Sequence, residues 1–238
     1  MKRFWESAAI QGESEGYSIR LDGRPMRLPG GAVLMVRPKK LALAVAEEWQ
    51  LAGGAKGDEM SFDDTPLTRV AGTAQERIAP DPDPTVDAIA RYGESDLLCY
   101  RAETPPALVE RQEARWQPWL DWVAREYDAP LRVTAGIGYI KQHHDSIDRL
   151  RRAVAAQDVY VLAGLGIAVP ALGSLVLGLT LAAGALDAAT AAELGALDEL
   201  FQAELWGEDE EAAKRRASVR ADIHLAARFI TLSKAAAG

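Results

Sequence analysis

The sequence predicts an α+β protein, with a small N-terminal β-rich subdomain followed by a larger, mostly α-helical domain. Two observations support this class. The first 36 residues are expected to form strands, and apolar residues alternate with polar ones from Tyr17 to Leu21, which is the period of a strand. From Pro38 onward, apolar residues recur every three or four positions, which is the period of a helix. We place the boundary at residue 60, with a β-rich segment and one following helix over 1–60 and a helical domain over 61–238.

The β-rich segment contains a hairpin signal. The stretch YSIRLDGRPMRLP alternates apolar and polar residues from Tyr17 onward. Its Asp22-Gly23 pair favours the tight turn that joins two antiparallel strands. The stretch AVLMV, at 32–36, is expected to form another short strand.

Two helices are expected next. Pro38 suits a first helical turn, and the first helix should stop at Gly53. The second helix should cover 65–79. Their buried stripes are expected to contain Leu41, Val45, Trp49 and Ala52 in the first helix, and Leu67, Val70, Ala71, Ala74 and Ile78 in the second.

The remainder of the chain is predicted to be mainly helical. A short helix should cover 85–92, and the segment 96–103 can be a strand or an extended connection. A long helix should follow Pro105, in which Pro118 either introduces a kink or starts a new helix. Further helices are expected over 145–157, 188–206 and 208–231.

Residues 159–186 form an apolar run with no charged side chain, long enough to cross a bilayer. The run has no flanking Lys/Arg cluster or paired aromatic belt, and Pro170 lies near its middle. We therefore expect two buried helices, over 158–169 and 170–185, at the centre of the helical domain. A membrane-associated protein is the alternative that rests on this run alone.

The search for chemistry in the sequence finds no catalytic, cofactor or metal motif. The stretch GLGIAV lacks the third small residue of a dinucleotide fingerprint, and no GxxxxGK[ST] motif occurs. Cys99 is interpreted as a small buried hydrophobe and His143-His144 as the start of a helix. The net charge of −8 argues against a nucleic-acid partner. We therefore expect that the protein is not an enzyme and that it binds no cofactor and no metal.

Five stretches carry a resemblance to a known family. The chain resembles, over about 3–232 and in the expected order, the assembly chaperone specific for the alpha subunit of the F-type ATP synthase catalytic head, in its bacterial form. The stretches are VAEEWQ, DTPLTRVAGTAQERI, DLLCYRAETP, SLVLGLTLAAGALDAATAAELGALDE and DELFQAELWGEDEEAAKRRASVRADIHLAARFI.

The resemblance implies a β-rich subdomain followed by a helical domain, and no catalysis, cofactor or bound nucleotide. It implies binding to the unassembled alpha subunit, whose apolar interface would be covered until the beta subunit replaces the chaperone. Mitochondrial members carry a long targeting extension, whereas this chain begins almost at the β-rich segment. We therefore expect a protein of the bacterial cytoplasm with relatives in the mitochondrial matrix.

As partners we expect the alpha subunit, with no nucleic acid and no insertion into a membrane, and a monomer when the protein is free. The alternative function is that of a small-molecule-binding protein or a hydrolytic enzyme whose site forms only in three dimensions.

The client-binding site is predicted in DELFQAELWGEDEE, at 198–211. Leu194, Leu197, Phe201 and Leu205 are expected to form a buried stripe, with Glu199 and Gln202 facing outward. Trp206 either caps the core or anchors a partner. Charge reversal at Glu199 is expected to leave the melting temperature nearly unchanged. The predicted partner-binding residues are Glu199, Gln202, Trp206, Glu208 and Asp209.

The acidic run at 208–211 precedes a basic run at 214–216. Residues four positions apart on a helix are neighbours, so we expect the ion pairs Glu210–Lys214 and Glu211–Arg215.

Overall fold

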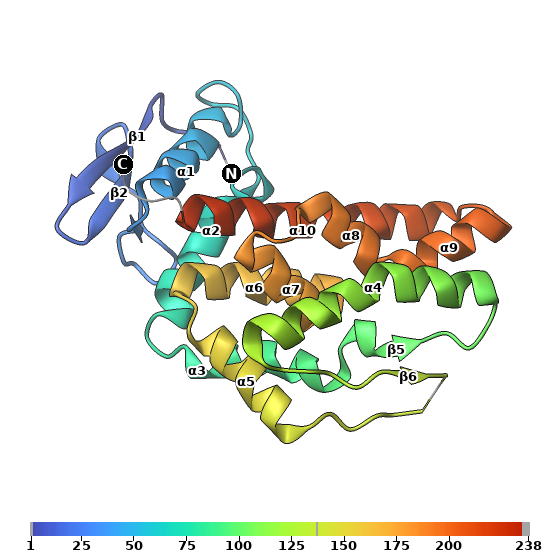
Figure 1. The fold of residues 1–238 in the computed structure, drawn as a ribbon. Helices are drawn as coiled ribbons and strands as arrows, with labels where there is room; N and C mark the ends of the chain where they lie inside the picture. The colour runs from blue at the N-terminus through green and yellow to red at the C-terminus, as the bar shows by residue number, and fades with distance from the viewer. Residues whose placement is uncertain (1, 137, 235–238) are drawn as a thin grey trace. The chain divides into compact units, whose positions relative to one another are not determined.

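The computed structural model describes residues 2–136 and 138–234 and divides into two compact units (Figure 1). The first unit contains Met1–Pro82, Val159–Gly164 and Arg228–Gly238, and the second contains Asp83–Asp158 and Leu165–Ala227. The expected boundary at residue 60 was placed after the first helix that comes after the change of period at Pro38. The two units are instead defined by contacts between residues in space. Two helices, α6 and α10, contribute residues to both units.

The first unit contains the predicted antiparallel sheet. Its strands run in the order β1-β2-β3, with β4 also paired to β2. The predicted hairpin is confirmed, because Leu21 pairs with Arg24 across Asp22 and Gly23, both of which have positive φ. The strand bounds are β1 Ala8–Glu13, β2 Gly16–Leu21, β3 Arg24–Pro25 and β4 Met35–Val36.

Two helices of the first unit pack through buried hydrogen bonds. They are α1 (Lys39–Leu51) and α2 (Pro66–Thr73), the latter continuing into a π-helical turn at Ala74–Ile78. All residues of the two predicted apolar stripes are buried. The carboxylate of Glu48 accepts hydrogen bonds from the backbone N–H groups of Leu67 (2.7 Å) and Thr68 (3.1 Å) at the start of α2.

The indole N–H of Trp49 donates to the hydroxyl of Thr68 at 2.8 Å. Burial raises the pKa of Glu48, and the hydrogen bonds from α2 oppose that rise. The motifs around Trp49 and Thr68 therefore have a structural role, because they join α1 to α2.

The second unit is mainly helical, as expected. Pro118 lies inside α4, which is assigned as a single helix, so Pro118 does not start a new one. The segment 96–103, for which the sequence allows two structures, contains a 3-10 turn and a short strand that pairs in parallel with β6. The bounds are α3 Asp83–Ala90, 3-10 turns Arg91–Ser95 and Leu97–Cys99, β5 Tyr100–Arg101, α4 Pro106–Tyr127, β6 Thr134–Ala135 and α5 His144–Ala155.

The apolar run forms two helices, α6 (Val159–Leu172) and α7 (Leu175–Ala183), and most of its side chains are buried. The helices are confirmed, but the predicted break at Pro170 is wrong. Pro170 lies in the last turn of α6, and the chain instead breaks at Gly173, where φ is +63°. In the part of the chain that the structure describes, no helix combines the length and the hydrophobicity needed to cross a membrane.

The start of α7 is held by Asp96, which is fully buried. Its carboxylate accepts hydrogen bonds from the hydroxyl of Ser174 (2.8 Å) and the backbone N–H groups of Val176 (2.9 Å) and Leu98 (3.1 Å). The carboxylate therefore joins the 96–99 segment to the N-terminus of α7, where the helix dipole favours negative charge.

The described part of the chain ends with three helices, α8 (Ala188–Gly195), α9 (Leu197–Trp206) and α10 (Glu210–Lys234). The single helix expected over 188–206 is therefore two, separated at Ala196, whose φ and ψ are −103° and 12°. A Cβ at Gly195 would lie 3.2 Å from a methyl carbon of Leu172, so this glycine allows the chain to approach α6 closely.

Candidate functional site

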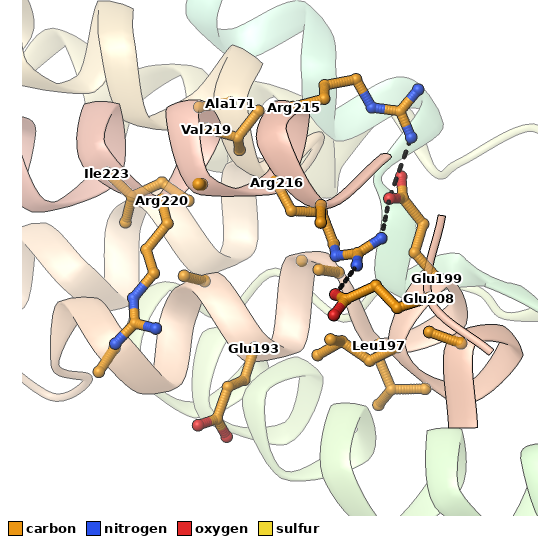
Figure 2. Close-up of a pocket in the computed structure, with 18 of the residues that line it drawn as sticks. Ala171, Glu193, Leu197, Glu199, Glu208, Arg215, Arg216, Val219, Arg220 and Ile223 are labelled. Carbon is orange, nitrogen blue, oxygen red and sulfur yellow. Dashed lines mark hydrogen bonds and ion pairs between the residues drawn. The ribbon is translucent and has the colours of Figure 1, made fainter. Parts of the chain in front are cut away.

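The second unit contains a groove of about 870 Å³, lined mainly by α8, α9 and α10 (Figure 2). Small and apolar side chains, among them Ala171, Leu197 and Val219, line it together with arginines and glutamates. No side chain from Glu210 to Asp222 is buried in the described structure of α10. The first half of α10 therefore contributes little to the core and is held mainly by polar contacts.

Arg216 is the centre of these polar contacts. Its guanidinium lies 2.6 Å from an oxygen of Glu208 and 3.6 Å from an oxygen of Glu199 (Figure 2). The Arg216 side chain is 14% exposed, so these pairs are better shielded from water than ordinary surface pairs. Arg215 adds a second contact to Glu199 at 3.0 Å. Together the three contacts join α10 to α9 and to the segment between them.

Two ion pairs from α4 flank the other side of the groove. Arg111 pairs with Glu204 at 2.8 Å, and its guanidinium lies 4.9 Å from the ring centre of Phe201. Arg115 pairs with Glu193 at 3.2 Å. All four glutamates that line the groove therefore have arginine partners, whereas Arg220 has no hydrogen-bond or ion-pair partner among the described residues.

The structure brings some of the predicted partner-binding residues together and leaves others apart. Glu199 and Glu208 meet around Arg216, and both carboxylates remain partly exposed. Asp209 accepts a hydrogen bond from the N–H of Ala212 at 2.8 Å, so it caps α10. Gln202 is exposed, and Trp206 is 78% exposed. Trp206 therefore does not cap the core, and its other role, as an anchor for a partner, is the one that its exposure favours.

The predicted buried stripe is right at three positions and wrong at the fourth. Leu194, Leu197 and Phe201 are buried, but Leu205 is 56% exposed. Leu197, Phe201 and Leu205 do follow one another at four-residue steps in α9, but Leu205 lies in the last turn before Gly207, beyond the buried part of that face. Leu205 and Trp206 are therefore two adjacent apolar side chains in solvent.

The ion pairs around α10 also differ in part from those predicted. Glu210 pairs with Lys214 at 2.6 Å, as expected. Arg215 pairs with Glu199 instead of Glu211. Sequence spacing identified pairs within one helix, but it could not identify pairs between helices. It therefore missed the ion pairs of Arg216, Arg111 and Arg115 with glutamates that line the groove.

The titratable groups with the largest pKa shifts do not line the groove. Burial raises the pKa of the Cys99 thiol to about 12, so this fully buried thiol is unsuited to act as a nucleophile. Burial likewise raises the pKa of Asp96 to about 6, and its hydrogen-bond donors oppose that rise. His144 contacts Asp148 at 2.7 Å in the first turns of α5, and no group of three candidate metal ligands occurs in the described residues.

The groove combines paired charged side chains with small and apolar ones. Its carboxylates are paired with arginines, and its neighbouring helix end presents a leucine and a tryptophan to solvent. Exposed aromatic residues beside polar groups are frequent among the residues that dominate protein–protein binding.

Comparisons with known proteins identify the family of this chain. Residues 2–124 match a family described as ATP12 chaperone protein. The chain is 25% identical over 220 residues to the mitochondrial protein atp12 of Schizosaccharomyces pombe, covering 89% of this chain and 75% of that protein.

Two crystal structures share the whole fold. That of Atp12 from Paracoccus denitrificans is 42% identical, with a TM-score of 0.93 and 98% of each chain covered. That of an Agrobacterium tumefaciens protein is 35% identical, with a TM-score of 0.88, covering 96% of this chain and 84% of that one. The resemblance seen in the sequence and its α+β fold are confirmed, and the chain belongs to the ATP12 family of ATP synthase assembly chaperones.

Proposed function

We propose that this protein binds the unassembled alpha subunit of the F-type ATP synthase and covers its apolar interface until the beta subunit replaces it. Membership of an ATP synthase assembly chaperone family supports a subunit of that enzyme as the client. A free subunit exposes an interface larger than the few hundred Å² that soluble monomers tolerate, so covering it prevents aggregation without chemistry. The proposed compartment is the bacterial cytoplasm.

The proposed contact surface is the end of α9 and the start of α10. The single observation that carries it is the exposure of Leu205 (56%) and Trp206 (78%) at the end of an otherwise packed helix. Acidic residues surround them along the chain, at Glu204 and 208–211. Glu204, Glu208 and Glu210 already pair with cations. Asp209 and Glu211 have no ion-pair partner among the described residues, so this surface suits an apolar pocket with a basic rim. Glu199, Gln202, Glu208 and Asp209 are proposed to lie within the contact.

Catalysis is the less favoured function for the same groove. A general acid or base needs a carboxylate that is free to exchange a proton with a substrate. Glu193, Glu199, Glu204 and Glu208 are instead paired with arginines.

The proposal is tested by light scattering of purified alpha subunit as it aggregates. We expect an equimolar amount of the chaperone to suppress the scattering without ATP. Purified beta subunit is the matched control and should aggregate at the same rate with and without the chaperone. Protection of beta but not of alpha would show that the client is wrong.

A further inference from the structure

The first unit has an open sheet edge that the proposed contact surface does not use. β1 lies at the end of the strand order and, within the described residues, pairs on one side alone, with β2. The backbone N–H of Asp22 donates to the carbonyl of Ser7 at 2.9 Å. Hydrogen-bonded pairs alternate along antiparallel strands, so 7, 9, 11 and 13 face β2. The backbone groups of Ala8, Ile10 and Gly12 therefore point to the open edge.

The side-chain amide of Gln50 already occupies the beginning of this edge. Its oxygen accepts a hydrogen bond from the N–H of Ala8 at 2.8 Å, and its nitrogen donates to the carbonyl of Glu6 at 3.1 Å. The amide thus bonds to β1 as a peptide group of a neighbouring strand would. Beyond it, the N–H and carbonyl groups of Ile10 and Gly12 have no partner in the described structure.

The open part of β1 lacks the features that usually protect a sheet edge. Such edges are commonly blocked by proline, lysine, a bulge or a covering segment. The sequence of β1 is AAIQGE, and its residues pair one to one with β2, so it contains no bulge. Its charged residue, Glu13, lies at the hairpin end.

A hollow of about 790 Å³ lies against the same strand and has an apolar lining. Ala8 and Ile10 line it from β1, Leu43 from α1 and Leu232 from α10. Leu43 is 49% exposed, although most of α1 is buried. An extended chain paired with β1 would place alternate side chains on the side of this hollow.

The charges around the hollow indicate the chemistry of its occupant. Lys40, Glu47 and Arg228 line it, and none of the three has an ion-pair partner among the described residues. Arg228 also attracts the carboxylate of Glu48, but Lys40 and Arg228 outnumber the one carboxylate, Glu47, that lines the hollow, which favours an occupant with an acidic side chain.

We propose that β1 binds an extended segment of the client subunit as an additional strand. Main-chain hydrogen bonds from Ile10 and Gly12 provide affinity, which is the usual energetics of strand addition. An apolar side chain of the segment contacts Leu43, and an acidic one approaches Lys40 and Arg228. This inference rests on the proposed function, because it requires that alpha subunit is bound.

The direct test is amide hydrogen exchange of the whole chaperone, resolved by residue, with and without purified alpha subunit. We expect slower exchange at Ile10 and Gly12 in the complex. The N–H groups of Ala9 and Gln11 already donate hydrogen bonds to β2, so their exchange rates should change little. Slower exchange at alternate residues of β1 is therefore the result that identifies an added strand. A complex that forms while Ile10 and Gly12 exchange as before overturns the strand proposal and leaves the proposed function intact.

A pair of variants at one position tests affinity. Gly12→Pro removes an edge N–H without removing a bond to β2, and proline is tolerated on edge strands. We expect about tenfold weaker binding of alpha subunit, the effect of losing one or two hydrogen bonds. Gly12→Ala is the control, because its Cβ would lie 3.9 Å from Tyr17 and its N–H is retained. Equal affinity of the two variants contradicts the proposal.

Two further outcomes would contradict either the client segment as the occupant of the edge or the proposed function. Protection of Ile10 and Gly12 that grows with chaperone concentration in the absence of alpha subunit would show that a second copy of this chain occupies the edge, and would overturn a client segment. Failure of the wild-type chaperone to bind alpha subunit would contradict the proposed function itself.

Discussion

Arg216 and Glu208 form a 2.6 Å ion pair across the connection between α9 and α10. Glu199 completes the contact from the other side of the guanidinium at 3.6 Å. Because the first half of α10 buries no side chain in the described structure, this pair has a large share in keeping that segment against the groove.

Replacing Arg216 with glutamine should loosen the start of α10. Removal of the largely shielded guanidinium leaves Glu208 without a counter-charge and Glu199 with Arg215 alone, so we expect a loss of about 1 kcal/mol in the free energy of unfolding. Amide exchange over 210–222 should become faster. Lys214→Gln is the control, because its pair with Glu210 is exposed at both ends. Equal effects of the two changes would mean that Arg216 has no special role.

Trp206→Ala should separate binding from stability. The side chain is 78% exposed, so its removal should change the free energy of unfolding by less than about 0.5 kcal/mol. If Trp206 anchors the client, affinity for alpha subunit should fall at least about tenfold. Calorimetric titration measures the affinity of this variant for alpha subunit. Tyr139→Ala is the control, because Tyr139 is a similarly exposed aromatic residue (71%). Similar affinities for the two would exclude Trp206 as an anchor.

Glu199→Lys should affect stability as well as binding. The sequence suggested that this charge reversal would leave the melting temperature nearly unchanged, but it would bring a lysine close to Arg215 and Arg216. We expect a loss of about 1 kcal/mol in stability together with loss of alpha-subunit binding.

A second change distinguishes direct contact from indirect destabilisation. Adding Arg215→Glu restores an opposite-charge pair and should restore the melting temperature. If Glu199 contacts the client, binding stays weak in this double variant. Recovery of binding together with stability would assign Glu199 a structural role.

The regular helices of this protein were predictable from sequence, whereas the breaks at Gly173 and Ala196 were not. The stripe through Trp49 and Ala52 was predictable because the helix is regular and packs on one face. The break near Pro170 was misplaced because proline is the stronger general signal. The actual break uses Gly173 with a left-handed φ, followed by Ser174, whose hydroxyl caps α7 by accepting from Leu177 at 3.0 Å. A Gly-Ser pair before an apolar segment could have indicated it.

The sequence identified which helices line most of the groove, but not the contacts between their side chains. Helical periodicity identified Glu199 and Gln202 as lying off the buried stripe. It placed Leu205 on that stripe, because the four-residue spacing from Phe201 does not show that the last turn of α9 lies in solvent. The pairing of Arg216 with Glu208 and Glu199 joins elements through space, and one sequence carries no signal for such a pairing.

Asp96 should make stability depend on pH. Its pKa in the folded protein is raised from 3.8 to about 6, so the folded state binds a proton more tightly than the unfolded state does. The contribution to stability is fully present below pH 3.8 and is lost as the pH rises to about 6. Relative to Asp96→Asn, the wild type should therefore lose roughly 3 kcal/mol across this window, because each tenfold difference in proton affinity corresponds to about 1.36 kcal/mol.

Urea denaturation of the two proteins between about pH 4 and pH 7 measures this difference. Taking the difference between wild type and Asp96→Asn cancels the titration of the surface carboxylates. A difference that is independent of pH, or that grows as the pH rises, would mean that the hydrogen bonds from Ser174, Val176 and Leu98 outweigh the effect of burial.

This chaperone is proposed above all to hold the alpha subunit until the beta subunit takes its place. Native mass spectrometry of purified chaperone mixed with alpha subunit, before and after addition of beta subunit, tests that role most directly. We predict a complex of one chaperone with one alpha subunit that forms without nucleotide, and release of the chaperone as alpha–beta species appear. A chaperone that forms no complex with alpha subunit, or that binds beta subunit instead, would contradict the proposed role.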